Sequence, residues 1–95
     1  MNYWSWGGKY IGSRSGEYLY SKKGNPLGVF YDNELYDFLG NYIGEIRKKN
    51  RIIVNKNRKN KRKSGKCKPC DKCGTSCCDY VGYMMLCGYE DFNLE

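Results

Sequence analysis

The sequence predicts an all-β fold made of tandem β-hairpin repeats, followed by a basic linker and a cysteine-rich tail. Three observations predict it. The first fifty residues repeat at a spacing of sixteen, aromatic residues make up 16% of the chain, and each repeat contains turn-forming residues at fixed places. Aromatic side chains favour strands, and a short repeat indicates units that bury their apolar faces on one another. At 95 residues the chain has the length of one domain.

The repeat consists of five columns that agree in chemical type across three copies. Two of these columns hold glycine in every copy, which is hard to obtain by chance with only 12 glycines in the chain. Each copy predicts a strand, a turn, a second strand and a second turn. The columns are Tyr3, Leu19 and Leu35; Trp4, Tyr20 and Tyr36; Gly8, Gly24 and Gly40; Ile11, Leu27 and Ile43; and Gly12, Gly28 and Gly44.

The glycine columns predict two different roles. Gly24 and Gly40, each followed by asparagine, stand where a hairpin loop needs a positive φ. Gly12, Gly28 and Gly44 fall inside the second strand, where glycine weakens the strand unless another group packs closely on its backbone. We expect the recurring aromatic residue to be that group.

The repeats define the predicted domain organisation. Residues 1–54 form the hairpin domain, with units near 3–18, 19–34 and 35–50 and a partial fourth unit from residue 51. A basic linker follows at 55–66. The cysteine-rich tail occupies 67–95.

The fourth unit is only partly recognisable. Its register begins near Arg51-Ile52, but the first glycine column then falls on Lys56. Tyr80-Val81-Gly82 echoes Tyr42-Ile43-Gly44, so we expect the tail to return as a strand at 79–86 and to complete the unit. An incomplete unit would leave a sheet edge through which copies could self-associate.

The second and third units resemble the repeats of bacterial four-fold β-flower proteins. The residues that carry the resemblance are Leu19-Tyr20-Ser21-Lys22-Lys23-Gly24-Asn25-Pro26-Leu27-Gly28 and Leu35-Tyr36-Asp37-Phe38-Leu39-Gly40-Asn41-Tyr42-Ile43-Gly44. The resemblance covers roughly residues 3–54. It implies four hairpin petals around a pseudo-four-fold axis, often with a basic tail, and it transfers no active site. The cysteine cluster is not part of the family motif.

The basic linker contains six cations in eight residues and no apolar side chain, so it cannot contribute to a core. We expect it to be disordered on its own. Such a run attracts nucleic acid or another polyanion, because contacts with phosphates release counterions. The alternative is a solvated spacer, and an anionic membrane surface is a weaker third partner. The candidate binding residues are Lys56, Arg58, Lys59, Lys61, Arg62 and Lys63.

The cysteine-rich tail carries the most specific chemical signal, because five of its six cysteines lie within twelve residues. Four thiolates from such a run can complete a tetrahedral zinc site. An iron–sulfur cluster is a second interpretation, since the spacing matches a ferredoxin run that lacks its second half. Free or disulfide-bonded cysteines are the third. For zinc we favour Cys67, Cys70, Cys73 and either Cys77 or Cys78, with Cys87 as a replacement.

The sequence indicates binding rather than catalysis. It has no histidine, and it lacks a phosphate-binding P-loop. We therefore predict a non-catalytic, metal-stapled module that binds nucleic acid or another polyanion. The alternative is a structural, protein-interaction or self-assembly module with a solvated basic spacer. No segment is apolar enough to span a membrane and no signal peptide is recognisable, so we predict a cytoplasmic location.

Overall fold

The computed structural model describes residues 1–72, 74 and 77–92. Its strands are β1 (Asn2–Ser5), β2 (Tyr10–Ser15), β3 (Tyr18–Ser21), β4 (Pro26–Tyr31), β5 (Glu34–Tyr36), β6 (Tyr42–Arg47), β7 (Arg51–Asn55) and β8 (Tyr89–Asp91), with a 3-10 turn, η1, at Lys56–Arg58. Each strand pairs antiparallel with the next, which confirms the all-β fold class and the tandem hairpins. Within the described chain there is no helix with the length and apolar character needed to cross a membrane.

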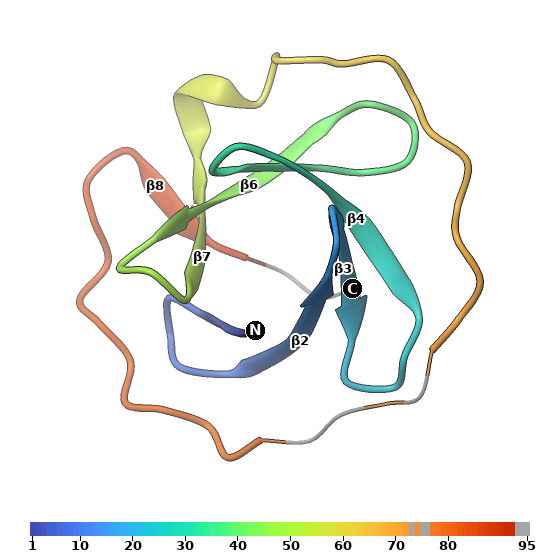
Figure 1. The fold of residues 1–95 in the computed structure, drawn as a ribbon. Helices are drawn as coiled ribbons and strands as arrows, with labels where there is room; N and C mark the ends of the chain where they lie inside the picture. Colours follow the sequence, from blue (N-terminus) through green and yellow to red (C-terminus); the bar gives the residue numbers. More distant parts are fainter. Residues whose placement is uncertain (73, 75–76, 93–95) are drawn as a thin grey trace.

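The sheet closes on itself. β1 pairs in parallel with β7, with Trp4 opposite Arg51 and Ser5 opposite Ile52. β8 pairs with the remaining part of β7, so the two strands β1 and β8 share one side of it. The first seven strands therefore form a ring of consecutive hairpins, as Figure 1 shows.

The first three hairpins have the same register. In each, the column residue of the first strand pairs with the strand glycine, and a bulge follows one residue later; the pairs are Tyr3 with Gly12, Leu19 with Gly28 and Leu35 with Gly44. A Cβ on Gly12 would lie 1.8 Å from the carbonyl oxygen of Tyr20. The aromatic residue of the next hairpin does pack on this glycine, but through its backbone rather than its ring.

The turn before β7 is one residue longer than the turn before β5, so the sixteen-residue spacing does not continue into the fourth hairpin. Arg47 pairs with Arg51 across a turn of three residues, whereas Tyr31 pairs with Glu34 across only two. The additional residue shifts β7 by one position. Ile52, rather than Arg51, therefore continues the buried column that begins with Tyr3.

The tail returns to the fourth hairpin at a different place from the expected one. Ile53, Val54 and Asn55 pair with Asp91, Glu90 and Tyr89. Residues 79–86 form no strand and lie beside the first hairpin instead. We expected an incomplete fourth unit to leave an open sheet edge. In the structure β1 and β8 together pair with that edge of β7.

The core lies inside the ring and draws on every hairpin. One cluster of buried side chains consists of Tyr3, Ile11, Leu19, Phe30, Leu35 and Ile52. A second consists of Tyr36, Tyr42 and Val54. Phe92, which follows β8, packs against both clusters. The tail therefore contributes Phe92 to the core. This residue follows β8, which is the only strand among the described residues of the tail.

Between η1 and β8 the chain runs around the outside of the ring, and we call residues 59–72, 74 and 77–88 the belt (Figure 1). It passes the tips of the third, second and first hairpins in that order. At each tip a belt amide donates to a glycine carbonyl: Lys63 to Gly40 (2.8 Å), Lys72 to Gly24 (2.9 Å) and Tyr80 to Gly8 (2.7 Å). These turn positions therefore favour glycine for two reasons. The backbone has a positive φ, and the belt approaches it closely.

Candidate functional site

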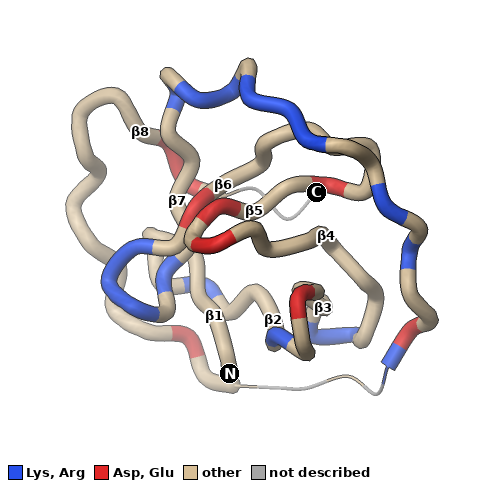
Figure 2. Tube along the Cα trace, turned by 45° about the horizontal axis from the view of Figure 1, so that its top comes forward, with Lys and Arg blue, Asp and Glu red and all other residues tan. Residues whose placement is uncertain are grey.

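The cations of the linker and of the adjoining belt lie in chain order along the outer edge of the ring. Figure 2 shows them as a succession of blue segments. All nine side chains are exposed, and we call them the basic arc: Lys56, Arg58, Lys59, Lys61, Arg62, Lys63, Lys66, Lys68 and Lys72. The structure thus places the six predicted binding residues along this edge, and it adds Lys66 from the end of the linker and Lys68 and Lys72 from the tail.

Four cations of the basic arc are paired with carboxylates. Arg58 Nη1 lies 3.0 Å from Glu34 and 3.4 Å from Glu45, and Lys61 Nζ lies 2.8 Å from Glu34. The other two pairs are Lys59 with Glu90 and Lys66 with Glu17. The run that was expected to be disordered on its own is held against the folded chain by these partners. The sequence did not reveal them, because they come from other hairpins.

Five cations of the basic arc have no carboxylate partner among the described residues: Lys56, Arg62, Lys63, Lys68 and Lys72. Lys63 Nζ lies over the ring of Tyr31, 5.4 Å from its centroid, and Lys72 Nζ lies 5.6 Å from that of Tyr20. An aromatic ring orients a cation without neutralising its charge. The basic arc therefore retains positive charge that is available to an external anion.

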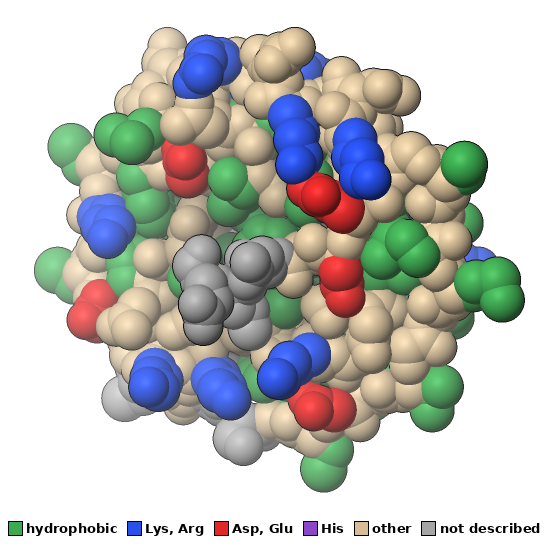
Figure 3. All heavy atoms as spheres, turned by 180° about the vertical axis from the view of Figure 1, so that it is seen from behind, with side chains coloured by type: hydrophobic (Ala, Val, Ile, Leu, Met, Phe, Trp, Pro, Cys, Tyr) green, Lys and Arg blue, Asp and Glu red, His purple; other side chains and the backbone are tan. Residues whose placement is uncertain are grey.

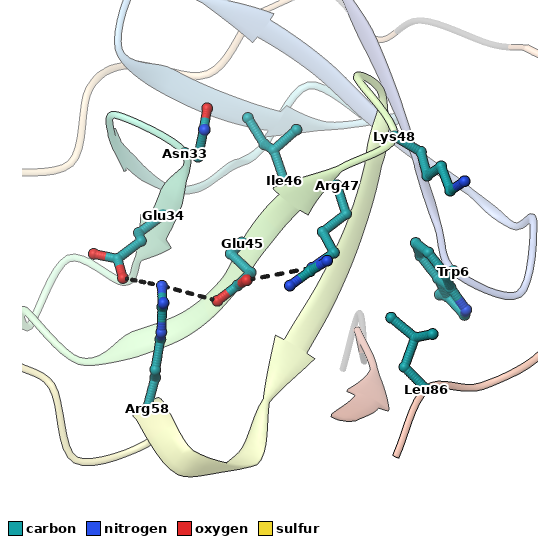
Figure 4. Close-up of a pocket in the computed structure, with 9 residues that line it drawn as sticks. All are labelled: Trp6, Asn33, Glu34, Glu45, Ile46, Arg47, Lys48, Arg58 and Leu86. Carbon is teal, nitrogen blue, oxygen red and sulfur yellow. Dashed lines mark hydrogen bonds and ion pairs between the residues drawn. The ribbon is translucent and has the colours of Figure 1, made fainter. Parts of the chain in front are cut away.

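A cleft of about 570 Å³ lies beside the start of the basic arc, between η1, β5 and β6 (Figure 4). A chain of ion pairs runs through it from Glu34 to Arg58, from Arg58 to Glu45, and from Glu45 to Arg47 at 3.7 Å. Trp6 and Leu86 face the cleft from the opposite side, as Figure 4 shows. Each carboxylate in the cleft already has a guanidinium partner.

Three titratable groups in or beside this cleft, Glu34, Tyr36 and Tyr42, have pKa values shifted away from neutral pH. Burial alone would raise the pKa of Glu34, but hydrogen bonds from Lys61 and Tyr36 and the charges of Lys61 and Arg58 outweigh it and lower that pKa. Burial, together with the bond to Glu34, raises the pKa of Tyr36 to about 12. Burial also raises the pKa of Tyr42, whose hydroxyl donates to Glu45 at 2.8 Å. General acid–base catalysis needs shifts in the opposite direction.

The cysteines do not form a metal centre in the described part of the chain. Cys67, Cys70, Cys78 and Cys87 are exposed and Cys77 is half-buried, and all five are free. Cys73 lies outside the described residues. No group of three cysteines, aspartates or glutamates among the described residues is placed to hold a metal ion.

The belt itself keeps the first two cysteines from forming a metal-binding turn. Lys66 donates its amide to Phe38, and Lys72 donates its amide to Gly24, so the chain between them spans two hairpin tips. Cys67 and Cys70 lie in this span without a turn. A zinc knuckle of the Cys-x2-Cys kind places both thiolates on one turn. The described residues show no such turn at Cys67 and Cys70, and the zinc and iron–sulfur interpretations stay predictions.

Sequence reasoning missed a second exposed feature, the apolar segment at residues 80–86. Its large side chains are exposed although the backbone is bonded to the first hairpin. The available signal was the absence of any charged residue from Tyr80 to Gly88. The echo of Tyr42-Ile43-Gly44 instead predicts a returning strand at 79–86.

Comparison with protein-family models, with curated proteins and with solved structures finds no match to this chain.

Proposed function

We propose that this chain is a non-catalytic binding module that holds nucleic acid or another polyanion along the basic arc. The observation that carries the proposal is a set of exposed cations that have no carboxylate partner among the described residues and lie on a backbone bonded to the ring. Each phosphate contact from such a cation releases counterions and adds affinity that falls with salt. A backbone already bonded to a folded ring loses little conformational freedom on binding.

The paired cations reduce this affinity without abolishing it. Exposed ion pairs contribute only about 0–1 kcal/mol each. A phosphate can therefore replace Glu17 or Glu90 as the partner of Lys66 or Lys59 at small cost. The whole chain has a net charge of +7, so it attracts a polyanion at long range.

Two further assignments belong to this proposal. We place the ring among four-fold β-flower proteins, supported by three hairpins of identical register and a fourth on β7 and β8. We also place the protein in the cytoplasm, which is consistent with free cysteines at the surface.

The test compares two triple variants that have the same net charge. One removes cations without partners, Lys56→Gln, Arg62→Gln and Lys68→Gln. The control removes three paired cations, Lys59→Gln, Lys61→Gln and Lys66→Gln. Binding of labelled single-stranded and duplex RNA and DNA is measured by fluorescence anisotropy over a range of salt concentrations.

We expect wild-type binding at low salt that weakens steeply as salt rises. The first variant should reduce the slope of log K against log salt by about 2 to 3, because each lost phosphate contact accounts for about 0.7–0.9. The control should reduce it less. No binding at low salt, or equal losses in both variants, would contradict contact through the unpaired cations.

A further inference from the structure

We propose that the polyanion on the basic arc is a single-stranded nucleic acid, and that one of its bases occupies a cavity between the tips of the second and third hairpins. The phosphates on either side of that base contact the lysines of the belt at the rim of the cavity. This inference rests on the proposed function, because it names the class of polyanion that the basic arc holds.

The first observation is the cavity itself, which has a volume of about 640 Å³. Its apolar lining comes from two hairpins. Pro26 and Leu27 begin β4, and Phe38 and Leu39 lie in the turn between β5 and β6. Sites for small ligands have volumes of about 300–1,000 Å³ and a mostly apolar lining with a few polar groups. The cavity therefore has the size and the lining of a site for one small apolar group.

The second observation is that the rim of the cavity belongs to the basic arc. Lys66 and Lys68 line the cavity from the belt, and both side chains are exposed. Lys68 has no carboxylate partner among the described residues, and Lys66 is paired with Glu17, which is also exposed. Figure 3 shows hydrophobic and basic side chains interspersed around the rim of the molecule. A ligand that joins an apolar group to an anion therefore matches this site.

The third observation is that aromatic rings accompany the cations of the basic arc. Phe38 lines the cavity and is half-buried, so part of its ring is accessible. Tyr31, also half-buried, lies near Lys63 and Lys66, whose Nζ atoms are 5.4 and 5.5 Å from its ring centroid. Proteins that bind single strands combine a cationic path for the backbone with aromatic rings on which the bases stack.

The cationic path continues along the belt beyond the cavity. The amide of Lys66 donates to the carbonyl of Phe38 at 3.1 Å, which holds the belt at the cavity. The amides of Lys63 and Lys72 donate to the tips of the third and second hairpins, so cations precede and follow the cavity on a bonded backbone. A ligand with one acidic group uses only part of this path. A chain with one phosphate per unit can use all of it.

Asp37, which also lines the cavity, indicates which part of the ligand enters it. Its Oδ1 accepts from the amides of Leu39 and Asn41 at 2.9 Å each, and its Oδ2 accepts from the side-chain amide of Asn41 at 3.2 Å. The turn thus fixes this carboxylate in place. A fixed carboxylate repels a phosphate or an acidic side chain, but it can accept from the N–H groups of a neutral base. The base rather than the phosphate therefore fits inside, and an acidic peptide fits less well.

The cavity and the cations predict opposite preferences between single strands and duplexes. In a duplex the bases are paired and stacked, so a base can enter the cavity only after it leaves the helix, which costs free energy. Contacts with phosphates alone favour the duplex, because its higher charge density condenses more counterions that binding releases. A preference for the single strand is therefore the signature of an occupied cavity.

The experiment measures binding at low salt by fluorescence anisotropy. The ligands are single-stranded DNA and RNA, duplex DNA of the same length, an abasic DNA strand that keeps the sugars and phosphates, and polyglutamate. Phe38→Leu removes the aromatic ring from the cavity but keeps an apolar side chain. Tyr83→Leu is the matched control, because Tyr83 is 45% exposed and lies outside both the cavity and the basic arc. Neither substitution changes the net charge.

We expect the wild type to bind the single strands more tightly than the duplex, the abasic strand or polyglutamate. Phe38→Leu should weaken binding of the single strands by about tenfold, which corresponds to about 1.4 kcal/mol and is in the range for one stacked base. It should leave binding of the abasic strand unchanged, because the cations remain. Tyr83→Leu should bind every ligand as the wild type does.

The wild type alone decides the main point, so the test does not depend on how well a variant folds. Equal affinity for the single strand and the abasic strand overturns this inference but leaves the proposed function standing. The same holds if polyglutamate binds as tightly as the single strand, or if Phe38→Leu weakens binding of the abasic strand equally. Absence of binding to every nucleic acid at low salt overturns both.

Discussion

The indole ring of Trp4 stacks on the phenol ring of Tyr80, with ring centroids 4.0 Å apart and planes inclined by 11°. Trp4 lies in β1, and Tyr80 lies near the end of the belt. The same indole donates through Nε1 to the carbonyl of Cys78 at 2.9 Å. Trp4 thus belongs to a strand of the ring and also contacts the returning tail at Cys78 and Tyr80.

We expect Tyr80→Ala to lower the free energy of unfolding by about 1 kcal/mol, because the stacked aromatic pair is lost. The ring should remain folded, since Tyr80 is not part of its core. Urea unfolding followed by tryptophan fluorescence measures the change. Val81→Ala is the control and should change the free energy by less than about 0.5 kcal/mol, because that side chain is exposed. Equal effects of the two substitutions would mean that the stacking contributes nothing.

Gly40→Ala should be more destabilising than Gly16→Ala. Both glycines have a positive φ, 94° at Gly40 and 61° at Gly16, so alanine costs about 1–2 kcal/mol at either place through backbone strain. A Cβ at Gly40 would also lie 1.9 Å from the carbonyl oxygen of Lys63, whereas Gly16 has no neighbour within 4 Å. Denaturant unfolding of the two variants measures the difference. If Gly16→Ala costs as much as Gly40→Ala, the belt does not approach this turn.

Stability should fall at alkaline pH because of Tyr36. Its pKa is raised from 10.0 in the unfolded chain to about 12 in the folded one. The stabilisation is therefore fully present below about pH 10 and is lost as the pH rises towards 12. Tyr36→Phe removes the ionisable group, so its free energy of unfolding should decline less over this range. Parallel curves for the two proteins would contradict a buried, neutral Tyr36.

Acid should weaken the contact between the basic arc and the ring through Glu34. Its pKa is lowered in the folded chain, so its contribution is present above the ordinary glutamate pKa and is lost as the pH falls through the lower folded value. Glu34→Gln should lose less stability over that range than wild type. Lys61→Gln, which removes both hydrogen bonds from the Lys61 ammonium to this carboxylate, should move the loss to higher pH. Thermal unfolding at a series of pH values measures all three proteins.

The three repeats show what the sequence alone could predict. Gly24 and Gly40 marked hairpin turns, and both have the positive φ that such turns require. Tyr3, Leu19 and Leu35 marked one column and lie together in the core. These features recur at a fixed spacing of sixteen residues, so they can be recognised by comparing the repeats with one another.

The belt and the candidate sites depended on distant contacts that leave no periodic signal. The turn before β7 has one additional residue. The glycine columns end at Gly44, before this turn, so the repeat does not indicate it. The carboxylates that pair with Arg58 come from β5 and β6, and the ring that holds Tyr80 comes from β1. The cysteine spacing predicts a metal knuckle, and nothing in the sequence indicates that the belt on either side of Cys67 and Cys70 is bonded to Phe38 and Gly24.

Amide hydrogen exchange of the belt tests the central claim most directly, because the basic arc and the apolar segment both depend on a belt bonded to the ring. The amides of Lys63, Lys72 and Tyr80 donate to the three hairpin tips and should exchange at least about tenfold more slowly than in an unfolded peptide. The neighbouring amides of Val81 and Met84 should exchange rapidly. If all five exchange at unfolded rates while Ile52 and Ile53 stay protected, the ring exists without a docked belt and the account is wrong.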